Sequence, residues 1–131
     1  LEGQRLLGKV VDVYDGDTCK IILLKDDKFV RYTCRLLGID TPEIKGKTDG
    51  AYRARNRLIQ LVTDVTIDLD NRGTHSATTR LVQVCCHAFD KYGRLLVKLY
   101  AQGDDSSCLN DVLLGDNLAK SYDGGHKEGF D

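Results

Sequence analysis

The sequence lacks several features that would mark other classes of protein. Its 131 residues contain one proline and no methionine. No apolar run approaches the roughly 20 residues that a membrane-spanning helix needs. There is no internal repeat, linker or low-complexity segment, and the length suits one domain with one core. We therefore expect a single domain over residues 1–131, with its core over 6–122 and a loose polar tail over 123–131.

A start at Leu1 without methionine predicts that a preceding segment was trimmed, so the lack of a signal peptide or anchor here says little about the native protein. The five cysteines are odd in number and follow no metal-ligand spacing. Within Cys85-Cys86-His87, neighbours on a strand point to opposite faces, which argues against a shared metal ion. Free cysteines favour a reducing, intracellular compartment.

The sequence also lacks an excess of positive charge: 19 Lys and Arg stand against 20 Asp and Glu, for a net charge of −1. This excludes a strong non-specific nucleic-acid binder of the usual basic kind. The charge is uneven, however: residues 1–60 hold 12 Lys and Arg against 9 Asp and Glu, and residues 61–131 hold 7 against 11. A polyanion is therefore expected to lie against the first half of the chain.

One stretch, Arg35 to Glu43, brings together several residues whose side chains could bind a metal ion or a phosphate. The single proline, Pro42, removes a backbone donor and predicts that an apolar strand ends there. Two carboxylates suit a hard metal ion, and an arginine can hold a phosphate through two parallel hydrogen bonds. The pattern indicates metal-assisted phosphate chemistry. A structural salt bridge beside a proline turn is the alternative.

Apolar periodicity and turn residues predict a mainly β chain with two helices. The expected strands cover residues 6–13, 18–24, 29–37, 65–69, 81–89 and 95–101, and the expected helices cover 51–64 and 108–114. Ser107 is the predicted cap of the second helix and Gly115 its left-handed stop. A hairpin centred near residues 26–27 places the corner at Asp17 beside the corner at Asp40. The fold class is α+β, mainly β: an OB-fold, a five-stranded barrel with packed helices.

Three motifs carry a family resemblance. The segments Asp15-Gly16-Asp17-Thr18, Arg35 to Glu43, and Asp90-Lys91-Tyr92-Gly93-Arg94 occur in that order. Together with Leu109-Asn110 and the segment from Gly115 to Lys120, they resemble the staphylococcal nuclease (thermonuclease-like) family over roughly residues 6–122. The resemblance implies an OB barrel with helices packed on it, in agreement with the strand pattern.

The resemblance also implies a metal centre. Asp17 and Asp40 would be carboxylate ligands of a Ca²⁺ ion, and the main-chain carbonyl of Thr41 would be a third ligand. Asp15 would be a further acid near the metal. An oxygen-only set of this kind leaves room for water and a phosphate oxygen.

The remaining implied roles concern the substrate. Glu43 would act on the attacking water, and Arg35 and Arg94 would hold the scissile phosphate and its developing charge. Lys91, Tyr92 and Tyr122 would line the nucleotide pocket. The chain differs from the family's simplest members in an apparent insertion over residues 70–81 and in the expected loss of the final helix.

The expected function is therefore a Ca²⁺-dependent, sugar-non-specific nuclease, a hydrolase that cuts phosphodiester bonds of DNA and/or RNA. The alternative is a catalytically weak domain of the same family that serves as an RNA- or protein-binding module. Family members that have lost catalytic activity lack several of the charged site residues. This sequence retains all five of them: Asp17, Arg35, Asp40, Glu43 and Arg94. A plain oligonucleotide-binding barrel would need clustered aromatics, but aromatics are only 7% of this chain. We expect nucleic acid as the partner, with single-stranded or flexible segments favoured, and a monomeric protein.

Overall fold

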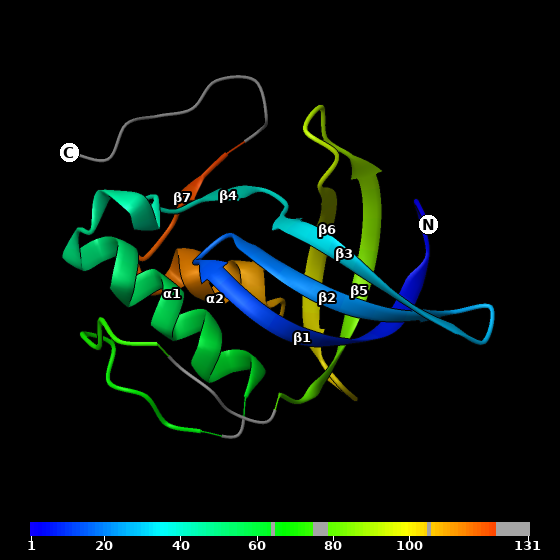
Figure 1. The fold of residues 1–131 in the computed structure, drawn as a ribbon, viewed down its shortest axis with the longest axis horizontal. Coiled ribbons are helices and arrows are strands. Elements are labelled where there is room, and N and C mark those ends of the chain that lie inside the picture. The colour runs from blue at the N-terminus through cyan, green and yellow to red at the C-terminus, as the bar shows by residue number, and fades with distance from the viewer. Residues whose placement is uncertain (64, 75–78, 105, 123–131) are drawn as a thin grey trace.

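The computed structural model describes residues 1–63, 65–74, 79–104 and 106–122. Five strands form a closed barrel in the order β1-β2-β3-β6-β5 (Figure 1). They are β1 (Arg5–Asp15), β2 (Thr18–Lys25), β3 (Lys28–Leu36), β5 (Leu81–Phe89) and β6 (Leu95–Ala101). The β3–β6 pair is parallel and the other pairs are antiparallel. The predicted α+β, five-stranded OB barrel is confirmed.

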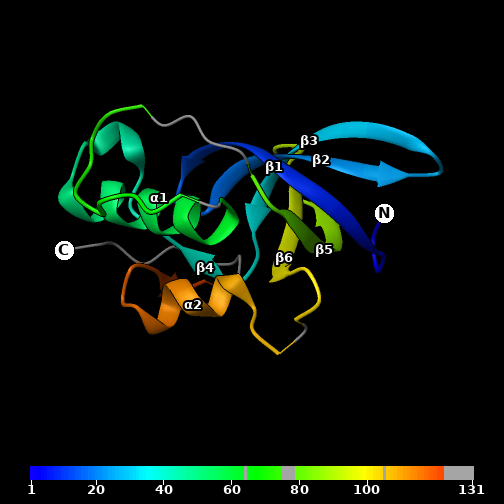
Figure 2. The same cartoon turned by 90° about the horizontal axis from the view of Figure 1, so that it is seen from below.

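Two helices pack at one end of this barrel. They are α1 (Asp49–Val62) and α2 (Leu109–Gly115), and the β2–β3 hairpin projects from the opposite end (Figures 1 and 2). A short 3₁₀ helix, η1 (Ile44–Gly46), precedes α1. Among the described residues, no helix is both long and apolar enough to cross a membrane.

The barrel core follows from the period-two alternation of the strands. Inward positions are fully buried, and the largest side chains among them are Ile21, Leu23, Leu36, Leu95 and Leu99. Three cysteines, Cys19, Cys34 and Cys86, occupy inward positions as small apolar side chains. Their thiols are free, as are those of Cys85 and Cys108.

Helix α1 begins two residues earlier than expected. The Oγ1 atom of Thr48 accepts a hydrogen bond of 3.1 Å from the N–H of Ala51, which caps the first turn. The apolar stripe of this helix, Ala51, Ala54, Leu58 and Val62, is completely buried against the barrel. The helix ends at Val62, two residues before the expected end at residue 64. Residues 64 and 75–78 and the predicted tail 123–131 lie outside the described residues.

The strand predicted over residues 65–69 is wrong. The segment is irregular because side chains of α1 bind its carbonyl oxygens in place of a neighbouring strand. Asn56 Nδ2 donates to the oxygens of Asp68 and Leu69 at 3.3 and 2.8 Å, and Gln60 Nε2 donates to that of Ile67 at 2.6 Å. Periodicity could not predict this, since the partners are side chains on another element.

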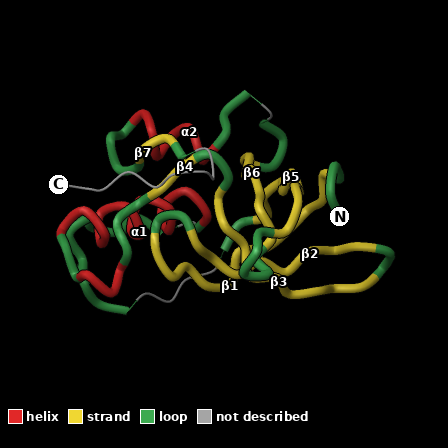
Figure 3. The backbone as a smooth tube through the Cα atoms, turned by 90° about the horizontal axis from the view of Figure 1, so that it is seen from above, coloured by secondary structure: helices red, strands yellow, loops and turns green. Residues whose placement is uncertain are grey.

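Both predicted boundaries of α2 are also wrong. Cys108, not Ser107, occupies the N-cap position, and its side chain makes no cap hydrogen bond. Gly115 is the last helical residue, and the left-handed position falls on Asn117, with φ of 58°. Asparagine tolerates this conformation because its short polar side chain can bond locally. The chain then forms β7 (Lys120–Ser121), which pairs with β4 (Ile39–Asp40) (Figure 3).

Candidate functional site

Two acidic corners meet beside the end of β3. In the β2–β3 register Thr18 lies opposite Arg35, so the turn before β2 sits against that arginine, as the hairpin predicted. The N–H of Leu36 donates to the main-chain oxygen of Asp17 at 2.8 Å. The N–H of Thr41 donates to Asp17 Oδ2 at 3.0 Å, which joins the first corner to the second.

Close packing of one glycine makes this meeting possible. A Cβ atom on Gly16 would lie 2.7 Å from Cβ of Ala54 and 2.8 Å from Cγ2 of Thr41. These distances are shorter than real carbon contacts. The turn at Gly16 can therefore pack between α1 and Thr41 only because Gly16 has no side chain.

Arg35 connects the buried charges of the site. Its Nη2 atom lies 3.5 Å from Asp17 Oδ2 and 3.3 Å from Asp40 Oδ1, while Nη1 donates to the main-chain oxygen of Ile39 at 3.0 Å. The three charged side chains are at most 10% exposed. The guanidinium carbon lies 4.8 Å from the centre of the Tyr122 ring, which follows β7. The β4–β7 pairing thus places the Tyr122 ring against the guanidinium of Arg35, the residue expected to bind phosphate.

A third carboxyl group adjoins this cluster. Asp15 is buried, and its Oδ1 accepts a hydrogen bond of 3.3 Å from the N–H of Asp17. Burial raises the pKa of Asp15 to about 8, and the side-chain hydrogen bond with Asp17 and the charge of Asp17 raise it further, whereas the hydrogen bond from the N–H of Asp17 acts in the opposite direction. Two carboxyl groups therefore contact the buried guanidinium of Arg35, and Asp15 adds a third carboxyl group next to Asp17.

The donor chemistry of this corner fits a hard cation. Asp17 and Asp40 offer carboxylate oxygens, and the Oγ1 atom of Thr41 is buried without a hydrogen-bond partner among the described residues. Across all residues that the structure describes, no group of three or more His, Cys, Asp or Glu side chains is placed so that it could hold a metal ion. A cation bound here would thus use two carboxylates and complete its coordination with main-chain oxygen and water.

Arg94 reaches the site from a separate turn, at the start of β6. The N–H groups of Tyr92 and Arg94 each donate to Asp90 Oδ1 at 2.9 Å, and Arg94 Nε donates to Asp90 Oδ2 at 2.8 Å. Burial acts to raise the pKa of Asp90, but these hydrogen bonds outweigh it and lower that pKa. The ionised carboxylate holds the turn and aligns the arginine.

One pocket of about 630 Å³ collects nearly all of the predicted site residues. Its lining contains Asp15, Asp17, Arg35, Asp40, Thr41, Glu43, Tyr92, Arg94 and Tyr122. Lys91 instead lines an adjoining pocket of about 590 Å³, which shares Arg35, Tyr92, Arg94 and Tyr122 with the first.

Sequence reasoning missed several lining residues. Tyr14 and Lys45 border the first pocket and Lys98 the second. Tyr14 directly precedes the Asp15 motif, and this adjacency was a usable signal. Lys98 had only the weaker signal of strand alternation, since it follows Leu96 on the same face of β6.

Glu43 lies at the rim of the first pocket. Its Oε2 atom is 3.3 Å from Nζ of Lys45, and the two side chains are 52% and 76% exposed. An ion pair this exposed contributes only about 0–1 kcal/mol to the free energy of unfolding. It is therefore too weak to hold the Glu43 side chain out of the pocket.

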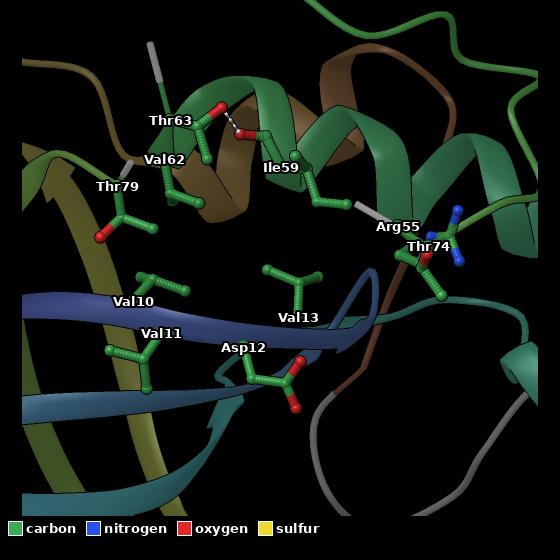
Figure 4. Close-up of a pocket in the computed structure, with 10 residues that line it drawn as sticks. All are labelled: Val10, Val11, Asp12, Val13, Arg55, Ile59, Val62, Thr63, Thr74 and Thr79. Atoms are coloured by element: carbon green, nitrogen blue, oxygen red, sulfur yellow. Dashed lines mark hydrogen bonds between the residues drawn. The ribbon is translucent and has the colours of Figure 1, made fainter. Parts of the chain in front are cut away.

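A further cavity of about 380 Å³ lies between β1 and α1 (Figure 4). It is lined mainly by valine, isoleucine and threonine side chains, with Asp12 and Arg55 as its charged members. Arg55 is engaged by Asn56 Oδ1 and by the carbonyl oxygens of Asn71 and Gly73. This cavity therefore has no cluster of charged side chains comparable to that of Asp17, Arg35 and Asp40.

Comparison with known families agrees with this geometry. The family model described as staphylococcal nuclease homologue matches residues 33–129, well over half of the chain. The match includes the segments of Arg35 and Arg94 but begins after Asp17. No curated protein matches the chain significantly. With the family model and the barrel in accord, the chain belongs to the staphylococcal nuclease homologue family.

Proposed function

We propose that this protein is a Ca²⁺-dependent nuclease that hydrolyses phosphodiester bonds of DNA and/or RNA without selecting the sugar. The main support is the buried contact of Arg35 Nη2 with both Asp17 and Asp40, at the floor of a pocket shared with Glu43 and Arg94. Family membership supports the nuclease class, and the oxygen-only donor set supports calcium.

In this proposal Asp17, Asp40 and the main-chain oxygen of Thr41 would hold the cation. A cation held there would polarise a phosphate oxygen, lower the pKa of attacking water and offset carboxylate charge. Arg35 binds a phosphate oxygen, with the plane of its guanidinium supported by the Tyr122 ring.

The two arginines bind the phosphate from different parts of the chain, Arg35 from β3 and Arg94 from the turn directly before β6. Preorganised cationic donors stabilise the charge that develops on phosphate oxygens in the transition state. Glu43, at the pocket rim, orients the water and accepts its proton. Tyr92, Tyr122 and Lys91 border the space where the nucleotide lies. None of these contacts requires a base edge, so sequence specificity is expected to be low.

The test is cleavage of labelled single-stranded DNA, duplex DNA and RNA by the purified protein with Ca²⁺ and with excess chelator. Cleavage that depends on Ca²⁺ is expected, with single strands preferred. Undiminished cleavage in chelator, or Zn²⁺ as the best cofactor, would contradict the proposed metal chemistry, because Zn²⁺ favours nitrogen and sulfur ligands. Size-exclusion chromatography with light scattering tests the expected monomer.

A further inference from the structure

Strands β2 and β3 carry an unusual charge pattern. They contain five Lys and Arg residues and no Asp or Glu, although the whole chain has a net charge of −1. The hairpin that they form starts at the candidate site and projects away from the helices (Figure 1). Two acidic residues of β1 pair with β2: Asp15, opposite Thr18, belongs to the candidate site, and Asp12, opposite Lys20, borders the basic surface on one side.

The strand register places a row of side chains on the same face as Arg35. Successive outward pairs are Thr18 with Arg35, Lys20 with Thr33, Ile22 with Arg31, and Leu24 with Phe29. The intervening Cys19, Ile21 and Leu23 are at most 1% exposed and point into the barrel. At about 3.3 Å per residue, Phe29 lies roughly 20 Å from Arg35 along β3.

Two residues of this row are available for a ligand. Most arginines of the chain donate hydrogen bonds to neighbours, as Arg53, Arg57 and Arg72 do. Arg31 is exposed and has no hydrogen bond or ion pair from its side chain within the described ranges. Phe29 is 75% exposed, the highest value of any large apolar side chain in the same ranges.

Phe29 also borders an apolar groove of about 500 Å³ on the outer surface of the barrel. The other side chains of this groove are Leu7, Lys9, Ile22, Leu24 and Leu81. A flat apolar wall beside a lysine and an arginine can hold a nucleobase while cations contact the flanking phosphates. Asp26 and Asp27 form the turn beyond Phe29, so a polyanion would be repelled past this point.

We propose that the outer face of β2 and β3 is a second binding region for single-stranded nucleic acid. It would hold nucleotides that flank the cleaved bond, with Arg31 on a phosphate and Phe29 stacked on a base. This inference rests on the proposed nuclease function, because the row begins at Arg35. It extends the substrate from a single nucleotide pocket to a strand of several nucleotides, within the roughly 4–16 that one OB barrel covers.

The test compares wild type with Phe29→Ala, Arg31→Gln and the control Lys28→Gln. Lys28 lies on the same hairpin with the same charge as Arg31, but strand alternation points it to the other face. Fluorescence anisotropy measures the binding of a single-stranded DNA octamer in chelator, where cleavage does not interfere. Steady-state kinetics with Ca²⁺ compares the octamer with a dinucleotide.

Phe29→Ala is expected to weaken octamer binding about 5–100-fold, from the loss of one stacked base. Arg31→Gln is expected to reduce the slope of log K against log salt by about 0.7. Both variants should raise KM for the octamer and leave the dinucleotide unchanged, while Lys28→Gln alters neither. Octamer affinities within twofold of wild type in both variants, or an equal loss in Lys28→Gln, would overturn the inference. If wild type binds the octamer but cleaves neither substrate, the proposed function fails and the binding region is still tested by anisotropy.

Discussion

Replacing Glu43 with glutamine is expected to lower the rate of cleavage strongly while changing the stability of the fold very little. Glutamine keeps the shape of the side chain but cannot accept a proton from water. Loss of a general base costs about 10²–10⁴ in rate, which corresponds to roughly 3–5 kcal/mol in the activation barrier. The same substitution removes the charge that Glu43 shares with Lys45, and an ion pair this exposed contributes only about 0–1 kcal/mol to folding.

The assay is single-turnover cleavage with Ca²⁺, together with urea unfolding of the same variant. We expect a large fall in turnover, a small change in KM and a stability within about 1 kcal/mol of wild type. Asp116→Asn is the matched control, because Asp116 also forms an ion pair, with Arg57, at a side-chain exposure of 40% and outside the pocket. A Glu43→Gln protein that retains more than about a tenth of wild-type turnover would refute the role of Glu43, since this is short of the general-base range.

Three further predictions concern the arginines, the glycine turn and the cysteines. Arg35→Lys and Arg94→Lys should each lose about 10²–10³ in single-turnover rate, because lysine keeps the charge but lacks the planar fork; near-wild-type rates in both would mean that the arginines only attract substrate. Gly16→Ala should lower the free energy of unfolding by about 1–3 kcal/mol in urea, because the added Cβ would collide with α1; unchanged stability would show that the turn can move aside. In the folded protein a thiol reagent at pH 8 should modify the partly exposed Cys85 and spare Cys34, since burial raises the pKa of Cys34 to about 12. Activity should survive this labelling, and loss of activity without unfolding would contradict a structural role for the cysteines.

The sequence determined the β2–β3 hairpin and its register almost completely. Alternating apolar residues and a polar turn fix which side chains face the barrel, and a slip of one residue would expose the whole inward set. This register alone places Asp17 beside Arg35. The motif around Pro42 likewise located the second corner, because the proline ends the strand between Asp40 and Glu43 and so leaves both carboxylates near the strand end.

The tertiary structure decided the features that depend on distant elements. The β4–β7 pair brings Tyr122 to Arg35, but two-residue strands have no periodicity to detect. Residues 65–69 look like a strand, yet their carbonyl oxygens bond to Asn56 and Gln60 of α1. A local pattern reports which face of a segment is apolar, whereas the partner of that face is set by packing and backbone hydrogen bonding across the whole barrel.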